Sequence, residues 1–252
     1  MRQHAPLLIR SFVSMPDNPA AIKGLVLTST QAASLSAALE EDAKGAIYSA
    51  VVSFADAVSG LQKGYFSWAT VKLYYVCFYL AKAAIARRGY CVFYVGKSPF
   101  CLDATPGASP QSRSGNSHTV VTSLYKHEVT VGVLNSQPID GAHAFDWLTC
   151  RREDVNYRDV RFSDPEVPEW FANVDAYGVR RIVGDYLSDP TLYAFDAAHA
   201  MIALPLEVLR QESQSQLKFP GLGLAEVEVE VLRRLFTDKR GPIHHFSFIG
   251  AA

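Results

Sequence analysis

The chain has 252 residues, and its 24 Lys and Arg residues nearly balance 25 Asp and Glu residues. This balance excludes a global positive field for nucleic-acid binding, so any contact with RNA or DNA has to be local. Hydrophobic residues make up 49% of the chain and charged residues 19%. A composition this apolar predicts that part of the surface faces a partner.

The N-terminal segment, residues 1–29, carries Arg10 and several prolines between short apolar runs. It lacks the continuous hydrophobic region of a signal peptide, and no window reaches the roughly 18 uncharged apolar residues of a membrane span. We therefore expect an irregular arm on a cytoplasmic protein with no membrane partner. Four cysteines without metal-ligand or disulfide spacing point to reduced thiols: Cys77, Cys91, Cys101 and Cys150.

Two long helices are expected next. Apolar residues recur at helical spacing from Thr30 to about Leu61, where Gly60 could end the helix. A second helix should run from Ser67, a plausible N-cap, to Arg88, before Gly89. Because the connection between them is short, the two helices should pack as an antiparallel pair.

The stretch "CVFYVGKSPFCLD" has a different character, with β-branched and aromatic residues on both sides of "GKS". It predicts a small β-hairpin. A phosphate-binding loop is disfavoured, since Cys91 stands where that motif needs its first glycine and Pro99 blocks a regular helix.

The remainder also reads as helical. A third helix should run from Asn116 or Ser117 to about Leu134, and a fourth should start near Asp140. "FSDPEVPEWF" predicts a turn or link, with Pro168 able to open a short helix. Further helices follow, one of them bent or restarted at Pro205, although "EVEVEVL" alternates as a strand does.

The segment "RSGNSH" joins an arginine and a histidine across the end of a polar loop. A histidine such as His118 has an unperturbed pKa near neutral pH and can transfer protons, and an arginine such as Arg113 can bind a phosphate. A metal-free ribonuclease requires both functions. Two other interpretations stand beside catalysis. Ser114 or Asn116 could cap a helix, with His118 as a first-turn residue bonded to the loop, or the segment could bind RNA without cleaving it.

"REDVNYR", residues 152–158, is the second constellation. One interpretation is a buried hydrogen-bond network with the "SDP" turn. In the other, Arg152, Asn156 and Arg158 bind a phosphate or an acidic partner.

Two histidine clusters and an aromatic stripe complete the candidates. Asp196 and His199 lie three residues apart, which favours a satisfied pair in the core, and the adjacent histidines in "PIHHF" at 242–246 give only a weak metal site. The aromatic residues from Tyr65 to Tyr79 recur at helical spacing, which favours a core position over a base-stacking platform.

With these residues taken together, the chain resembles the HEPN-like helical domains of prokaryotic conflict and antiviral defence systems. The similarity covers roughly residues 30–160 and rests on "SWATVKLYYVCFYLAKAAIARRGY", "RSGNSHTVVTSLYKHE" and "WLTCRREDVNYR". Active members carry Arg-x4-6-His on a regular helix and are metal-independent endoRNases that pair two motifs in a dimer. This chain departs from them at Ser114 and at Gly115.

The resemblance implies a mainly α fold, an antiparallel HEPN-like bundle over 30–165 with a small β-hairpin insertion. An N-terminal arm, 1–29, precedes the bundle and a helical extension, 166–252, packs on it. Because related members without activity act as scaffold subunits, it implies a non-catalytic accessory subunit that binds an ATPase or a nuclease and needs neither cofactor nor metal. The alternative is a homodimeric endoRNase that uses Arg113 and His118.

Overall fold

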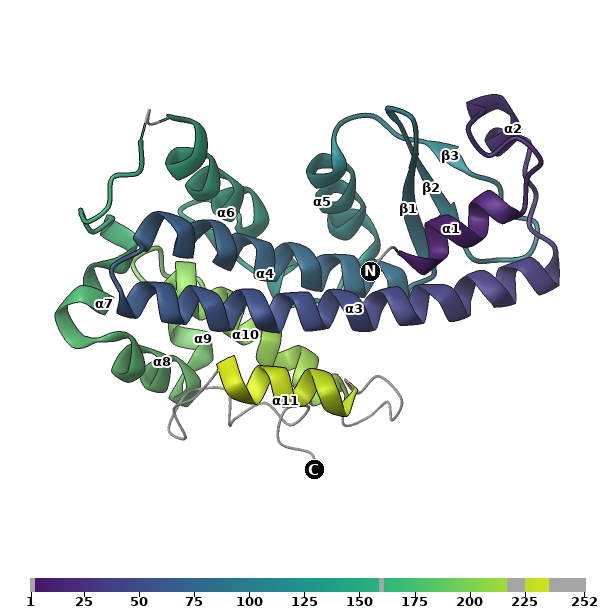
Figure 1. Cartoon of the computed structure of the whole chain (residues 1–252). Coiled ribbons are helices and arrows are strands. Elements are labelled where there is room, and N and C mark those ends of the chain that lie inside the picture. Colours follow the sequence, from purple (N-terminus) through teal and green to yellow (C-terminus); the bar gives the residue numbers. More distant parts are fainter. Residues whose placement is uncertain (1–2, 159–160, 217–224, 236–252) are drawn as a thin grey trace. The chain divides into compact units, whose positions relative to one another are not determined.

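The computed structural model describes residues 3–158, 161–216 and 225–235. These residues are mainly helical, with one three-stranded and one two-stranded antiparallel sheet (Figure 1). They divide into two compact units, residues 1–47 with 81–130 and residues 48–80 with 131–252. The helices α3 (Ser29–Gln62) and α4 (Phe66–Arg87) contribute to both units. Their bounds agree with the two long helices expected from the sequence to within about one residue at each end.

The antiparallel pairing of α3 and α4 is visible within each unit. In the second unit, Lys72 of α4 forms a 2.7 Å ion pair with Asp56 of α3. In the first unit, burial lowers the pKa of Lys82 of α4, and the nearby carboxylate of Asp42 of α3 partly opposes that shift. Residues later in α4 therefore lie beside residues earlier in α3, as they do in an antiparallel pair.

The first unit also holds α1 (His4–Ser11), α2 (Pro19–Lys23), β1 (Tyr90–Val95), β2 (Ser98–Asp103), β3 (Gln111–Ser112) and α5 (Ser117–Glu128). The arm expected to be irregular thus contains two helices. The reason lies in α1, whose first two backbone N–H groups, those of His4 and Ala5, donate to the carboxylate of Asp42 at 2.7 and 2.9 Å. A side chain 37 residues or more away satisfies donors that no local residue caps.

The predicted hairpin is present. Strands β1 and β2 pair antiparallel from Tyr90↔Asp103 to Val95↔Ser98, and β3 adds a third strand through Phe100↔Ser112 and Cys101↔Gln111. The two-residue turn is Gly96-Lys97, and Gly96 has a φ of 58°. A glycine suits this left-handed position because it has no Cβ to clash.

The second unit contains many short elements besides its parts of α3 and α4. In chain order they are η1 (Val133–Asn135), β4 (Pro138–Ile139), β5 (Ala142–His143), α6 (Ala144–Glu153), the π-helical turn η2 (Asp154–Arg158), η3 (Glu169–Phe171), α7 (Ala172–Tyr177), α8 (Val179–Ser188), α9 (Pro190–Tyr193), α10 (Ala200–Gln216) and α11 (Glu226–Leu235). Large side chains buried here include Tyr74, Phe54, Phe145 and Phe171. Tyr74 meets Phe145 edge to face at 6.0 Å, which ties α4 to α6.

The third and fourth helices differ from the sequence expectation. The third, α5, ends at Glu128 rather than near Leu134, because the β-branched run from Val129 to Val131 and then Gly132 favour other conformations. The fourth, α6, begins at Ala144 rather than near Asp140, since Asp140 and Gly141 both have positive φ and form the tight turn between β4 and β5. Asp-Gly is the preferred pair for such a turn.

The C-terminal elements follow the helical expectation where they are described. Helix α10 runs through Pro205 without a break, and "EVEVEVL" is helical in α11. Glu228 accepts from the backbone N–H of Ala225 at 2.9 Å, which is half of a capping box. The candidate histidines at 242–246 lie outside the described residues.

Helix α4 is the one helix in the described part of the chain that is long and apolar enough to cross a membrane. However, 72% of its most apolar 18-residue window is buried inside the protein. The burial is that of a core helix and is compatible with a soluble protein.

Candidate functional site

The "RSGNSH" segment links β3 to α5 in the first unit. The backbone N–H of Arg113 donates to the carbonyl of Pro99 at 2.9 Å, so Arg113 still belongs to the edge of the sheet. Gly115 turns the chain with a φ of 100°, and Asn116 then caps α5 by accepting from the N–H of Thr119 at 3.0 Å. His118 is half-buried in the first turn of the helix. Of the two predicted capping residues, Asn116 is therefore the N-cap of α5.

Arg113 lies at a polar hollow of about 590 Å³ formed by the loop and α5. The residues that line it include Arg113, Ser114, Thr119, Ser123, His127 and Glu128. Arg113 lines this hollow and His118 does not. We call this hollow the Arg113 hollow.

A hydrogen-bonded carboxylate stands at the end of α5 on the Arg113 hollow. Glu128 accepts from the hydroxyl of Tyr90 at 2.8 Å, and its other carboxylate oxygen lies 2.8 Å from Nδ1 of His127. These hydrogen bonds lower the pKa of Glu128, and the bond to Glu128 raises the pKa of Tyr90 to about 12. No sequence pattern points to this cluster, because Tyr90 and Glu128 are 38 residues apart along the chain.

Arg113 also acts on a buried thiol. Burial raises the pKa of Cys101, and the charge and hydrogen bond of Arg113 partly oppose that shift. Cys101 is 3% exposed, so its thiol is shielded from bulk solvent. The backbone bond to Pro99 holds Arg113 at the sheet edge, with its positive charge near the Cys101 thiol.

The second predicted constellation, "REDVNYR", lies on the last turn of α6 and on η2. Arg152 is 7% exposed, and its guanidinium carbon lies 4.7 Å from the centre of the Tyr74 ring. Arg158 is largely exposed and pairs with Asp154, whose second oxygen meets Arg151 at 3.3 Å. Asn156 is half-buried, and no side-chain hydrogen bond of it is found among the described residues.

Among the described residues, no hydrogen bond joins "REDVNYR" to the "SDP" turn, although the sequence predicted such a network. Asp164 instead accepts from the backbone N–H of Ser67 at 3.2 Å and so caps α4. The sequence placed the cap on Ser67 itself, whose side chain is fully buried. The capping carboxylate comes from a residue 97 positions away, which local sequence cannot reveal.

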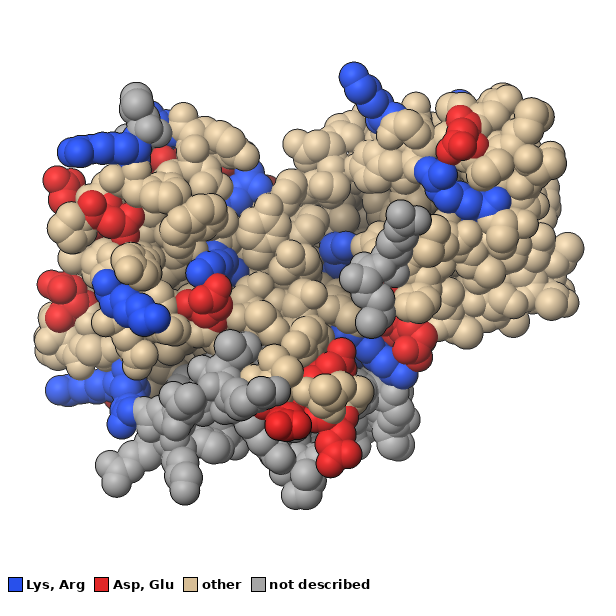
Figure 2. Space-filling model, in the orientation of Figure 1, with Lys and Arg blue, Asp and Glu red and all other residues tan. Residues whose placement is uncertain are grey.

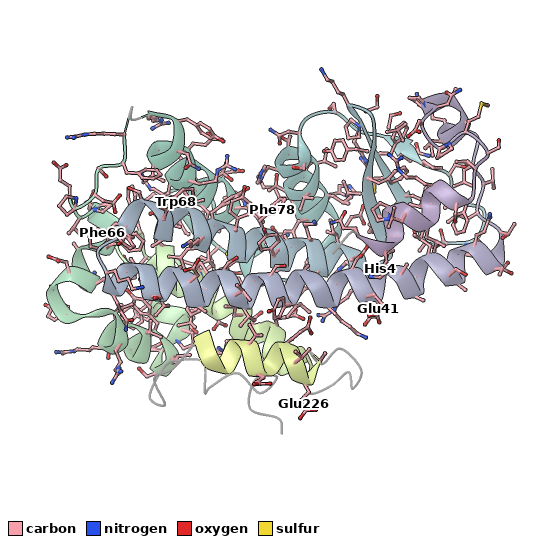
Figure 3. The ribbon with its side chains drawn as sticks, in the orientation of Figure 1. His4, Glu41, Phe66, Trp68, Phe78 and Glu226 are labelled. Carbon is pink, nitrogen blue, oxygen red and sulfur yellow. The ribbon has the colours of Figure 1, made fainter. Side chains whose placement is uncertain are left out.

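Not all of the aromatic stripe is core. Phe66, Tyr74 and Phe78 are buried, while Trp68 is 49% exposed and meets the 39% exposed Phe162 edge to face at 5.3 Å. Tyr65, immediately before α4, is 57% exposed. Figure 3 shows Phe66 and Trp68 on the first turn of α4. We call Tyr65, Trp68 and Phe162 the aromatic patch.

His199 is not paired with Asp196. Its Nδ1 lies 2.9 Å from the hydroxyl of Tyr186, and its ring packs against Tyr193 at 5.0 Å. Asp196 caps its own turn by accepting from the N–H of Ala198. The spacing of three that suggested a helical pair falls before α10, where the chain is not helical.

Within the described ranges, no group of three or more His, Cys, Asp and Glu residues is arranged to hold a metal ion. The four cysteines are free. No protein-family model, no curated protein and no solved structure matches this chain.

Proposed function

We propose that this protein is a non-catalytic helical subunit of a prokaryotic antiviral defence complex, and that it binds a protein partner, an ATPase or a nuclease, through the aromatic patch. The observation that carries the proposal is that Trp68 and Phe162 pack against each other while both stay partly exposed to solvent. Large aromatic side chains that remain half open to water, packed against each other from segments 94 positions apart, are typical of protein interfaces.

The charge distribution supports a protein partner over nucleic acid. On the face that Figure 2 shows, the Lys and Arg side chains of the described residues stand apart and most of the surface is uncharged. A nucleic-acid site normally has a continuous basic band. The exposed Lys63 and Arg161 adjoin the aromatic patch in sequence. The matching surface of the partner should therefore be apolar, with carboxylates at its rim.

The assignment to a defence complex rests on the HEPN-like pattern of the sequence. In such an assembly the helical subunit contributes shape and contact area, and another subunit performs the chemistry. Arg113 lies at the sheet edge and His118 in the first turn of α5, so the two do not share a regular helix as they do in active members, which fits this role.

A photocrosslinking experiment in the native host tests the proposal. A benzoylphenylalanine at position 68 should crosslink to one ATPase or nuclease that also co-purifies in fixed stoichiometry with the unmodified chain. The variants Trp68→Ser and Arg161→Glu should lose that partner, whereas the same crosslinker at Val26, which is 58% exposed in the other unit, should not capture it. No such partner at position 68, or equal capture from both positions, overturns the proposal.

The alternative function is a metal-independent endoRNase with Arg113 and His118 in a homodimer. The observation that favours it is the Arg113 hollow, where a cation, several hydroxyls and the exposed His127 share one surface. The purified protein would then cleave RNA in the presence of EDTA. RNA cleavage by His118→Ala and by His127→Ala should be compared. The variant that loses cleavage shows whether the histidine of the motif or the histidine of the Arg113 hollow is catalytic.

A further inference from the structure

A small pocket of about 40 Å³ lies in the first unit, beside the N-terminal end of α1. Gln3 and Pro6 form its α1 side, and residues of α3, α4, β1 and α5 supply the rest of its mostly apolar lining, which includes Lys82 of α4. We call it the Lys82 pocket. Its volume gives room for about three water molecules, or for a group of similar size such as an acetyl group.

The amine of Lys82 has no protein partner and is not sealed from solvent. Lys82 forms no hydrogen bond or ion pair with a described residue. Its side chain is half-buried, and its amine is not among the fully buried polar atoms that lack a partner. The lysines nearest to it in α3 and α4 differ, since Lys44 pairs with Glu41 at 2.8 Å and Lys72 with Asp56 at 2.7 Å. A reagent that enters the pocket therefore finds an amine that no carboxylate holds.

The surroundings of Lys82 favour its neutral, nucleophilic form. Burial lowers the pKa of Lys82, and the nearby Asp42 and Cys91 oppose that shift only in part. Tyr90 and Cys91 also line the pocket. The hydrogen bond to Glu128 raises the pKa of Tyr90 to about 12, and burial raises the pKa of Cys91, so neither group is charged near neutral pH. A desolvated lysine in an apolar pocket is a typical protein nucleophile.

The Lys82 pocket is also the place where α1 is anchored. Asp42, which lines the pocket, accepts from the backbone N–H groups of His4 and Ala5 at 2.7 and 2.9 Å. Figure 3 shows His4 beside the part of α3 that carries Glu41. The amine of Lys82 lies near this carboxylate and contributes a positive charge when it is protonated. A chemical change at Lys82 is therefore a change at the anchor of α1.

We propose that Lys82 is a covalent modification site, that a small acyl donor of the acyl phosphate or thioester class acylates it, and that acylation loosens α1. The neutral amine attacks the carbonyl carbon of the donor and forms a C–N bond. The bond from that carbon to the phosphate oxygen or to the thiolate sulfur breaks, the phosphate or thiolate leaves, and the amine proton passes to solvent. The product is an uncharged amide. Its acyl group occupies the space next to Gln3 and Pro6, and Asp42 loses a nearby cation.

The reactivity of Lys82 can be measured on the full chain with acetyl phosphate as the probe and peptide mass spectrometry as the readout. Near neutral pH, Lys82 should be acetylated several-fold faster than the exposed Lys97 of the same unit. Its rate should also level off at a lower pH than the rate at Lys97, because only the neutral amine reacts. A rate at Lys82 no higher than at Lys97, or the same pH dependence at both, overturns the proposal.

The link to α1 has its own measurement and matched variants. Hydrogen exchange of the α1 amides should be several-fold faster in the chain acetylated at Lys82 and in Lys82→Gln, which removes the charge as acylation does. Lys82→Arg keeps the charge and should leave the exchange rate unchanged, as should Lys97→Gln, which changes an exposed lysine of the same unit. Unchanged exchange after acetylation of Lys82, or equally fast exchange in Lys97→Gln, overturns the proposed effect on α1.

Discussion

The guanidinium of Arg152 lies 4.7 Å from the centre of the Tyr74 ring, and both residues are buried. Burial raises the pKa of Tyr74 to about 12, while the nearby positive charge of Arg152 opposes the shift. The contact joins the end of α6 to the middle of α4. It indicates that Arg152 stabilises the fold, in contrast to the exposed Arg158 of the same motif.

Arg152→Met should therefore lower the free energy of unfolding by about 1 kcal/mol, because a desolvated cation–π contact is lost while the side-chain volume is kept. Arg158→Met should change it by less than about 0.5 kcal/mol, as expected for an exposed ion pair. Urea unfolding of both variants measures the difference. An Arg152→Met protein as stable as the unmodified chain would contradict a structural role for Arg152.

The N-cap of α5 gives a prediction for the "RSGNSH" segment. Asn116→Ala should cost about 1 kcal/mol of stability, since the N–H of Thr119 loses its acceptor, whereas Asn116→Asp should keep most of it. Thermal unfolding with Ser114→Ala as the control measures this. If Ser114→Ala proved the more costly change, Ser114 rather than Asn116 would be the cap in solution.

The long-range cap of α4 can be tested in the same way. Asp164→Ala should lower the free energy of unfolding by about 1 kcal/mol, because the N–H of Ser67 is left without its carboxylate. Glu166→Ala, two residues along the same loop, serves as the matched control and should have little effect. Hydrogen exchange at the first turn of α4 should accelerate in Asp164→Ala only.

The pair Tyr90–Glu128 predicts two pH-dependent contributions to stability. The folded-state pKa of Glu128 is lowered, so its contribution is present above the unfolded value of about 4.3 and is lost as the pH falls through the lower folded value. The pKa of Tyr90 is raised from 10.0 to about 12, so its contribution is present below pH 10 and is lost as the pH rises toward 12.

Tyr90→Phe should remove the alkaline contribution and weaken the acid one, since Glu128 loses its first hydrogen-bond donor. Urea unfolding at several pH values between about 3 and 11 measures both limbs. Identical pH profiles for Tyr90→Phe and the unmodified chain would show that the hydrogen bond does not form in solution.

Much of the fold could be predicted from residues close together in the chain. The bounds of α3 and α4 follow from apolar periodicity and from Gly60 and Gly89, and the hairpin follows from β-branched and aromatic residues around "GKS". The start of α6 was predictable in principle, because the pair Asp140-Gly141 is typical of a hairpin turn. The helical pattern of the residues that follow this pair obscured the turn. The cap Asn116 was among the candidates for the same local reason.

The candidate sites were less predictable than the fold elements. The sequence singled out Arg113 with His118 and Arg152 with Asn156 and Arg158, all by their spacing. The structure also brings Tyr90, His127 and Glu128 together with Arg113, and Trp170 together with Arg151, and these groupings depend on chain segments that meet only after folding. The roles predicted for His118 in catalysis and for Asn156 in binding stay predictions.

Residue order and composition were enough to predict the helical class, the hairpin and the near-neutral, apolar character of the chain, because propensity, periodicity and charge are local or additive properties. Which helix ends are capped from a distance and which side chains stack became known only from the folded chain. Asp42 reaches α1 and Asp164 reaches α4 across 37 or more positions, and Trp147, Arg151 and Trp170 form one stack. Such pairings arise from packing, in which the distance along the chain carries no information about the distance in space.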